Sequence, residues 1–263
     1  MKNILKAFSY ILFYMIFQVI VMSLIAIIVA NLKGNINEVE SFMNNNVLGL
    51  TIFTNIFTIL IILLFFKVRK KKLLHEINIK AVSINKYVLP CISAFCFSSA
   101  FALLTYNINF ENAIQIKSSV EYYSSILPYL GTVLQIIVLL LVSPITEEVI
   151  CRGLILTTLQ KKYSNIIAVI LSSLLFGGIH IMAGGILLVI GAIIMGSIFG
   201  IIYVKSKSLL PAIVAHIVAN IPDFIIALLP RISPTIQYFL IIVFAIIFGL
   251  TIYKFITKEN VKL

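Results

Sequence analysis

Long apolar runs alternate with short polar segments along the chain. Each run has the length and composition that an α-helix needs to cross a bilayer, which is about 20 residues for a hydrocarbon core of about 30 Å. The runs lie at about 7–30, 47–66, 87–106, 129–159, 166–183, 186–204, 209–229 and 236–256. This pattern predicts an all-α polytopic membrane protein with about eight transmembrane helices, and we expect 1–263 to form a single transmembrane domain.

The basic residues are distributed unevenly over the polar segments between these runs. An even number of spans places both termini on one side, and 16 of the 20 Lys and Arg residues then fall on that side. Because cytoplasmic segments of membrane proteins carry an excess of Lys and Arg, we expect both termini in the cytoplasm. The basic run at 67–72 could bind anionic lipid head groups or a partner, but we interpret it as a cytoplasmic anchor that follows the second span.

The composition agrees with a membrane protein and argues against two other classes. Hydrophobic residues make up 61% of the 263 residues and charged residues 11%, whereas soluble proteins have about 25% charged residues. The net charge of +11 does not indicate nucleic-acid binding, because the basic residues stand in short clusters between apolar runs. Cys91, Cys96 and Cys151 lie within apolar runs, which is typical of packing residues and not of a disulfide framework.

One apolar run contains charges that a hydrocarbon environment does not explain. Residues 143–153, SPITEEVICRG, place Glu147, Glu148 and Arg152 between VLQIIVLLLV and LILTTL. An ionisable group at that depth costs about 3 kcal/mol on insertion scales unless it is paired or has a function. We therefore identify this segment as the centre of a candidate site.

The spacing within this segment predicts two different roles for the two glutamates. Glu148 and Arg152 are four residues apart with the acid first, which is the favourable order for an ion pair along a helix. Glu147 points about 100° away around the helix and remains available as a general base. Pro144 is expected to kink the helix three residues earlier and to make room for water.

Two later runs carry polar residues at a similar predicted depth. His180 lies near the end of one run, and His216 is followed at helical spacing by Asn220 and Asp223. A single intramembrane histidine usually makes a hydrogen bond between helices. Two histidines together with two glutamates and an arginine indicate a shared polar site instead. Asp223 is near the outer end of its run, where we interpret it as solvated or as a partner of this polar face.

Three short motifs occur in order along these runs, and each stands on its own predicted span. They are EExxxR at Glu147, Glu148 and Arg152, FxxxH at Phe176 and His180, and HxxxN at His216 and Asn220. In this order they resemble the CPBP family of intramembrane proteases, also called the ABI family. That family includes the type II CAAX prenyl endopeptidases and bacterial proteins of bacteriocin processing or self-immunity. The resemblance covers about 140–225, inside a motif-bearing core of about 129–229.

The resemblance implies an endopeptidase that hydrolyses a peptide bond of a membrane-associated peptide or protein. Carried over by motif, the roles are activation of water by Glu147 and His180, oxyanion stabilisation by His216 and Asn220, and support by Glu148 and Arg152. Cys151 departs from the family pattern, which usually has an aromatic residue before the arginine.

The family is often described as metalloproteases, and Glu147, His180 and His216 could supply a zinc site. The chain has no HExxH pair, so three separate helices would have to converge on the ion. We therefore prefer a metal-independent mechanism in which glutamate activates the water.

Other functions remain open from the sequence. The first is a non-catalytic membrane scaffold or a bacteriocin self-immunity protein, in which the motifs form a structural polar core. A solute or proton transporter is a weaker hypothesis, because the chain shows neither inverted repeats nor paired broken helices.

The composition also indicates where the chain works and what surrounds it. Its abundance of Ile, Asn and Lys is typical of an AT-rich bacterium, so we expect a multi-pass protein of the bacterial plasma membrane. A bacteriocin precursor or the leader of a secreted peptide is then a better candidate substrate than a prenylated protein. We expect residues 107–128 to form an outer loop and residues 73–86 to form a short interfacial helix.

Overall fold

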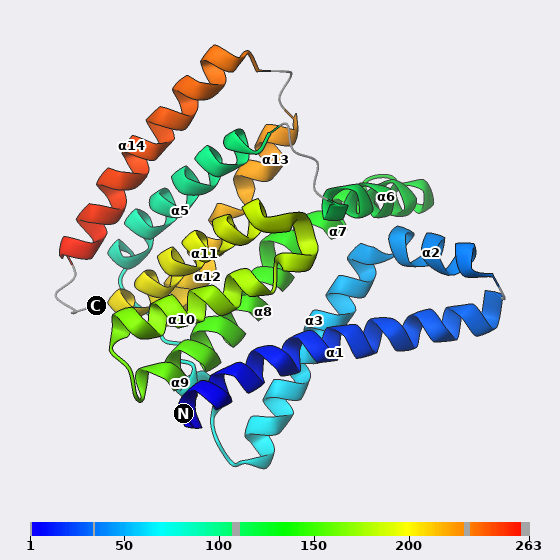
Figure 1. Ribbon diagram of the computed structural model, residues 1–263, viewed down its shortest axis with the longest axis horizontal. Helices are drawn as coiled ribbons and strands as arrows, with labels where there is room; N and C mark the ends of the chain where they lie inside the picture. Colours follow the sequence, from blue (N-terminus) through cyan, green and yellow to red (C-terminus); the bar gives the residue numbers. More distant parts are fainter. Residues whose placement is uncertain (1, 34, 107–110, 229–231, 259–263) are drawn as a thin grey trace.

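The computed structural model of this chain describes residues 2–33, 35–106, 111–228 and 232–258. Every regular element in these ranges is a helix (Figure 1). In chain order they are α1 (Lys2–Lys33), α2 (Ile36–Asn45), α3 (Val47–Val68), α4 (Leu73–Glu76), α5 (Asn85–Leu104), α6 (Glu111–Ile126), α7 (Leu130–Ile137), η1 (Val138–Val142), α8 (Ser143–Glu148), η2 (Val149–Leu156), α9 (Thr157–Gln160), α10 (Asn165–Gly178), α11 (Ile181–Ser206), α12 (Leu209–Ala219), α13 (Ile221–Leu228) and α14 (Pro234–Lys258), where η marks a π-helix.

Within the described ranges, seven helical segments are long and apolar enough to cross a membrane. They are Asn3–Leu32, Val47–Val68, Asn85–Leu104, Leu130–Gln160, Gly185–Ser206, Leu209–Ile226 and Pro234–Lys258. The remaining predicted span, 166–183, corresponds to α10, which has 14 residues. At 1.5 Å per residue α10 is about 21 Å long, shorter than the hydrocarbon core. The all-α polytopic membrane protein is confirmed, with one of its eight expected spans short.

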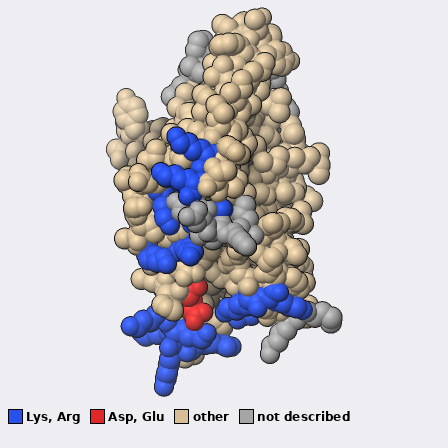
Figure 2. All heavy atoms as spheres, turned by 90° about the vertical axis from the view of Figure 1, so that its left-hand side faces the viewer, with Lys and Arg blue, Asp and Glu red and all other residues tan. Residues whose placement is uncertain are grey.

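The first turn of α1 and the last turn of α14 lie at the same end of the bundle (Figure 1). Basic side chains gather over this end (Figure 2). Two lysines reach across to the backbone of another segment: Lys86 Nζ donates to Ser206 O at 3.3 Å, and Lys205 Nζ donates to Ile256 O at 3.0 Å. The clustering of charge at one end agrees with the predicted topology, and the cytoplasmic orientation of this end stays a prediction.

The connection between α3 and α5 is less helical than predicted. Instead of a helix over 73–86, it contains only the single turn α4, because Asn78 adopts a left-handed conformation with φ of 54°. The remainder docks on the start of α12, where Leu209 N donates to Asn78 O at 3.0 Å and Ser208 Oγ donates to Lys80 O at 2.6 Å. The backbone groups that a helix would have satisfied internally are therefore partly paired with another segment.

Residues 111–126 of the predicted outer loop at 107–128 form helix α6. Residues 107–110 lie outside the described ranges, and the outer position of this connection stays a prediction. One serine fixes α6 against the junction of α2 and α3. Ser119 Oγ donates to Asn45 O at 2.9 Å and accepts from Leu48 N at 3.2 Å. The sequence pattern missed this helix because its polar residues resemble those of a solvated connection.

Helices α10 and α11 pack with their backbones close together because glycines stand at the contact. A Cβ atom on Gly177 would overlap Ile193 Cγ1 and would lie 3.0 Å from Val189 O, and a Cβ atom on Gly200 would lie 3.0 Å from Val169 Cγ1. Such small residues allow close approach where the hydrophobic effect does not drive association.

This contact predicts opposite effects for two adjacent substitutions. Gly177→Ala should destabilise the protein by about 1–3 kcal/mol through overpacking against α11. Gly178→Ala is the matched control, because nothing lies within 4 Å of its Cβ position, and removing a helical glycine should be neutral or stabilising by up to about 1 kcal/mol. Thermal unfolding of the two variants in detergent would measure the difference, and equal melting temperatures would contradict the close packing.

Candidate active site

The charged motif lies on a helix whose geometry alternates between α and π. The span Leu130–Gln160 runs continuously from α7 to α9, and π-helical segments η1 and η2 flank the short helix α8. The sequence predicted a kinked α-helix here. The helix carries two π-helical segments, a local geometry that is frequent at functional sites, and the kink itself stays a prediction.

Pro144 and Asn220 are linked through one backbone carbonyl. At the end of η1 the N–H of Ser143 donates to Val138 O, five residues earlier. The next N–H would donate to Leu139 O, but residue 144 is proline and has no N–H. Asn220 Nδ2 donates to Leu139 O at 2.6 Å instead. The carboxamide of the HxxxN motif thereby satisfies the carbonyl that the proline leaves without a partner.

Glu148 and Arg152 form the predicted ion pair in full burial. Arg152 Nη1 donates to Glu148 Oε1 at 2.6 Å, and both side chains are 0% exposed. Arg152 Nη2 also donates to Gly196 O at 2.8 Å. The guanidinium lies over the rings of Phe176 and Phe199, at 4.6 Å and 5.3 Å from their centroids. The ion pair is confirmed, and it connects η2 to α10 and α11.

His216 lies between the two glutamates. Its Nδ1 is 3.0 Å from Glu148 Oε1, so this nitrogen carries a proton and donates to the carboxylate. Its Nε2 is 3.8 Å from Glu147 Oε2. The imidazole also stacks on Phe199, with the ring centroids 4.5 Å apart. The histidine of α12 is therefore fixed from one side by Glu148 and presents Nε2 toward Glu147.

His180 is oriented by the first residue of its own motif. Its Nδ1 is 2.8 Å from Phe176 O, a carbonyl that can only accept, so Nδ1 donates and Nε2 of the neutral ring is left as an acceptor. The Phe176 ring is 4.9 Å from the His180 ring and 5.9 Å from the His216 ring, centroid to centroid. Phe176 thus contacts both histidines and Arg152, which gives the FxxxH spacing a physical reason.

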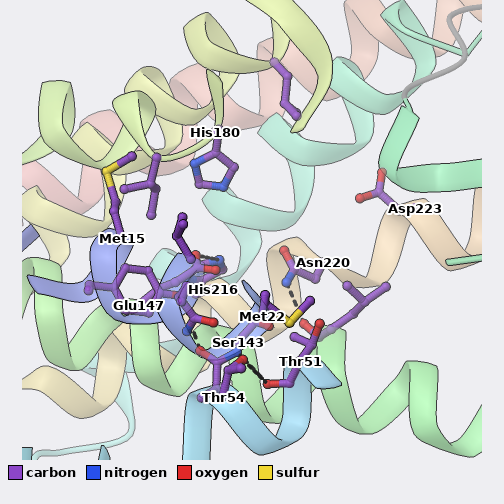
Figure 3. Close-up of a pocket in the computed structure, with 17 residues that line it drawn as sticks. Met15, Met22, Thr51, Thr54, Ser143, Glu147, His180, His216, Asn220 and Asp223 are labelled. Atoms are coloured by element: carbon purple, nitrogen blue, oxygen red, sulfur yellow. Dashed lines mark hydrogen bonds and ion pairs between the residues drawn. The ribbon is translucent and has the colours of Figure 1, made fainter. Parts of the chain in front are cut away.

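All four residues that the sequence predicts for chemistry line one cavity of about 610 Å³ (Figure 3). These residues are Glu147, His180, His216 and Asn220. The Glu147 side chain is 16% exposed whereas that of Glu148 is 0% exposed, so the cavity meets the first glutamate and not the second. Asp223 lines the same cavity from α13 and is exposed to it (Figure 3).

Sequence reasoning missed the residues that the first two long helices contribute. Helix α1 places Tyr14 and Gln18 in the cavity wall, and α3 places Thr54 and Asn55 there. Tyr14 Oη donates to Asn55 Oδ1 at 3.3 Å, which joins the two helices. The available signal was the presence of Gln18 and Asn55, whose amide groups are costly in an apolar span unless they are paired.

Glu147, His180 and His216 were the candidate zinc ligands from the sequence, and they are not grouped as a metal site in the part of the chain that the structure describes. Among the described residues, no three His, Cys, Asp or Glu side chains are close enough together to hold a metal ion. His216 Nδ1 is engaged by Glu148 and His180 Nδ1 by Phe176, so only the Nε2 atoms could serve as ligands.

Fold and site together define a polytopic membrane protein with a carboxylate and two histidines around an internal cavity. Residues 129–222 match the family described as Type II CAAX prenyl endopeptidase Rce1-like. The chain is also similar to a protein described as "Putative membrane peptidase YdiL" of Bacillus subtilis (strain 168), with 33% identity over 117 residues. That match covers 40% of this chain and 47% of the relative, so it spans about half of the relative's length.

No solved structure matches the chain. The family match at 129–222 includes all three motifs, and the two matches confirm the resemblance to the CPBP family. At the level of the family, they support a membrane protease.

The link between Pro144, Leu139 and Asn220 predicts a non-additive pair of substitutions. Asn220→Ala removes the donor to Leu139 O and should cost about 1–3 kcal/mol of stability, the typical cost of a buried polar group without a partner. Pro144→Ala restores a backbone N–H at the position that can serve this carbonyl. The double variant should therefore lose less stability than the sum of the two single changes, as measured by a thermal unfolding cycle. Strict additivity would show that the two residues are independent.

Proposed function

We propose that this chain is an intramembrane endopeptidase that hydrolyses a peptide bond of a membrane-associated peptide or protein. The observation that carries this proposal is the convergence of Glu147, His180, His216 and Asn220 on one cavity inside the bundle. The family-level matches support the same reaction class.

The nucleophile in this proposal is a water molecule held at Glu147 and His180. The carboxylate of Glu147 accepts a proton from this water as its oxygen attacks the peptide carbonyl carbon. His180 Nε2 is an acceptor for the second hydrogen, since its Nδ1 already donates to Phe176 O. The proton on Glu147 then passes to the amide nitrogen, the C–N bond breaks, and a carboxylic acid and an amine are the products.

His216 and Asn220 are the proposed donors to the oxyanion of the tetrahedral intermediate. Asn220 Nδ2 has two hydrogens, and one of them is used on Leu139 O, so the second is free for this role. His216 donates from Nε2 when both of its ring nitrogens carry protons. Preorganised donors of this kind are worth about 3 kcal/mol each.

The separation between Glu147 Oε2 and His216 Nε2 suits this division of labour. At 3.8 Å the two atoms are too far apart for a direct hydrogen bond. A water or substrate oxygen at about 2.8 Å from each can contact both. The base and one oxyanion donor therefore face the same small volume, which the attacking and developing oxygens must share.

Glu148 and Arg152 have a positioning role in this proposal. Glu148 Oε1 accepts from both Arg152 and His216, so it fixes the orientation of the imidazole. Arg152 in turn is held by Gly196 O and two aromatic rings.

The substrate class that fits a bacterial membrane is a bacteriocin precursor or another secreted peptide.

The test compares peptides released by wild type and by Glu147→Gln in the native host. The substitution keeps the shape of the side chain and removes its basicity, so we expect at least one peptide product to fall by about 100-fold or more. Mass spectrometry of membrane and medium would identify the product, with protein levels matched by immunoblot. Glu121→Gln is the control, because it makes the same chemical change on α6 and outside the cavity.

Two outcomes of this experiment would overturn the proposal. Unchanged peptide profiles for Glu147→Gln would exclude a protease that uses this residue. A biological effect that survives Glu147→Gln but is lost on deletion would favour the non-catalytic scaffold or self-immunity protein.

Metal independence gives a separate prediction. Because the proposed steps use protein groups alone, proteolysis by purified protein should keep its rate after dialysis against a strong chelator. A loss of activity that added zinc restores would show that Glu147, His180 and His216 converge on an ion during turnover.

A further inference from the structure

Two further cavities lie at the basic end of the bundle, and Glu147 lines neither of them. One cavity of about 190 Å³ is lined mainly by polar side chains, and a neighbouring cavity of about 240 Å³ is lined mainly by apolar ones. Both are lined by α1, by the second half of α3 and by η2 of the span Leu130–Gln160, which we call the motif helix. Neither contains a residue assigned to the proposed reaction.

The polar cavity carries an excess of positive charge. Its lining includes four basic side chains, Lys6, Arg69, Lys71 and Lys161, and one acidic side chain, Glu76. Lys71 Nζ is 3.1 Å from Glu76 Oε1, and this hydrogen bond lowers the pKa of the Glu76 carboxyl. The charge of Lys71 is thereby offset, while Lys6 of α1, Arg69 directly after α3 and Lys161 directly after α9 also line the cavity.

The apolar cavity adjoins the polar one through shared residues. Ser9, Tyr10, Phe65, Phe66 and Leu154 line both cavities. The apolar part adds Phe13, Ile61, Ile62 and Ile150. Together the two cavities form a site, which we call the interfacial site, with a cationic compartment at the basic end and an apolar compartment deeper in the bundle.

We propose that the interfacial site binds an anionic phospholipid of the surrounding leaflet. The phosphate diester would contact Lys6, Arg69 and Lys161, and an acyl chain would lie in the apolar compartment. Charge complementarity favours this occupant, because a basic residue near an anionic membrane surface attracts such lipids. The order of the compartments also matches a lipid, whose charged head lies at the interface and whose chain lies in the hydrocarbon region.

The position of the site gives the lipid a structural effect. Ile150 and Leu154 belong to η2, which begins one residue after Glu148. In α1, Tyr10 lies four residues and Phe13 one residue before Tyr14, which lines the cavity with Glu147. A bound acyl chain would contact both helices and hold α1 against the motif helix. The proposal does not depend on the proposed proteolysis, because it concerns binding and stability.

The test uses purified protein and a phosphatidylglycerol that carries a photoactivatable diazirine in its acyl chain. We expect cross-links on Tyr10, Phe13 or Leu154, and we expect phosphatidylglycerol to raise the melting temperature by several degrees over phosphatidylcholine. The variant K6Q/R69Q/K161Q should lose cross-linking, by about fivefold for each charge removed. K72Q/K162Q/K258Q is the control. It also removes three positive charges, but these three lysines are exposed and line neither cavity.

A second variant keeps the proposal testable if the triple variant does not fold. Ser9→Phe leaves all charges in place and introduces a ring where the two cavities adjoin, so it should abolish the cross-link to Leu154. Equal cross-linking by both triple variants would reduce the effect to general surface charge and overturn a built site. Two results would overturn the anionic lipid as the occupant. One is that inorganic phosphate raises the melting temperature as much as phosphatidylglycerol does, and the other is that a diazirine phosphatidylcholine cross-links as strongly as the phosphatidylglycerol probe.

Discussion

The site depends on one ion pair that is buried inside a membrane protein. Removing either Glu148 or Arg152 would leave a charge without its partner at 0% exposure, a change that typically costs 3–5 kcal/mol. Arg152 contacts the backbone of α11 and the rings of Phe176 and Phe199, while Glu148 contacts His216 of α12. Four helices are therefore located relative to one another by a single pair of charges, and the cavity with Glu147 lies beside that pair.

Much of this arrangement could be predicted from the sequence, because charges in apolar runs are costly enough to be informative. The acid-first spacing of Glu148 and Arg152 predicted their contact, and the one-residue offset of Glu147 predicted that it faces elsewhere. Composition and periodicity also identified the long spans. These inferences succeeded because each depends on local spacing or on the length of a single run.

Features that depend on contacts between distant segments could not be predicted in the same way. The spacing of the motifs did not show that His216 Nε2 lies 3.8 Å from Glu147 Oε2, and the shared action of Glu147 and His180 on water stays a prediction. Helix α6 was missed because Ser119 and its neighbours have the composition of a loop. The contacts that fix this helix are made with distant residues at the junction of α2 and α3. The contribution of Tyr14 and Asn55 to the cavity wall was missed as well, since no local pattern shows which face of α1 meets α3.

The π-helical segments have a further consequence for the phase of the motif helix. Each π turn accommodates an additional residue relative to an α-helix, so a change of one residue turns everything beyond it by about 100°. The direction of Glu147 is therefore set by the number of residues in η1 as much as by the side chains around it. The number of residues in this span therefore matters as well as their identity. A substitution can preserve the direction of Glu147. An insertion or deletion between Val138 and Val142 would alter that direction even if every polar side chain were retained.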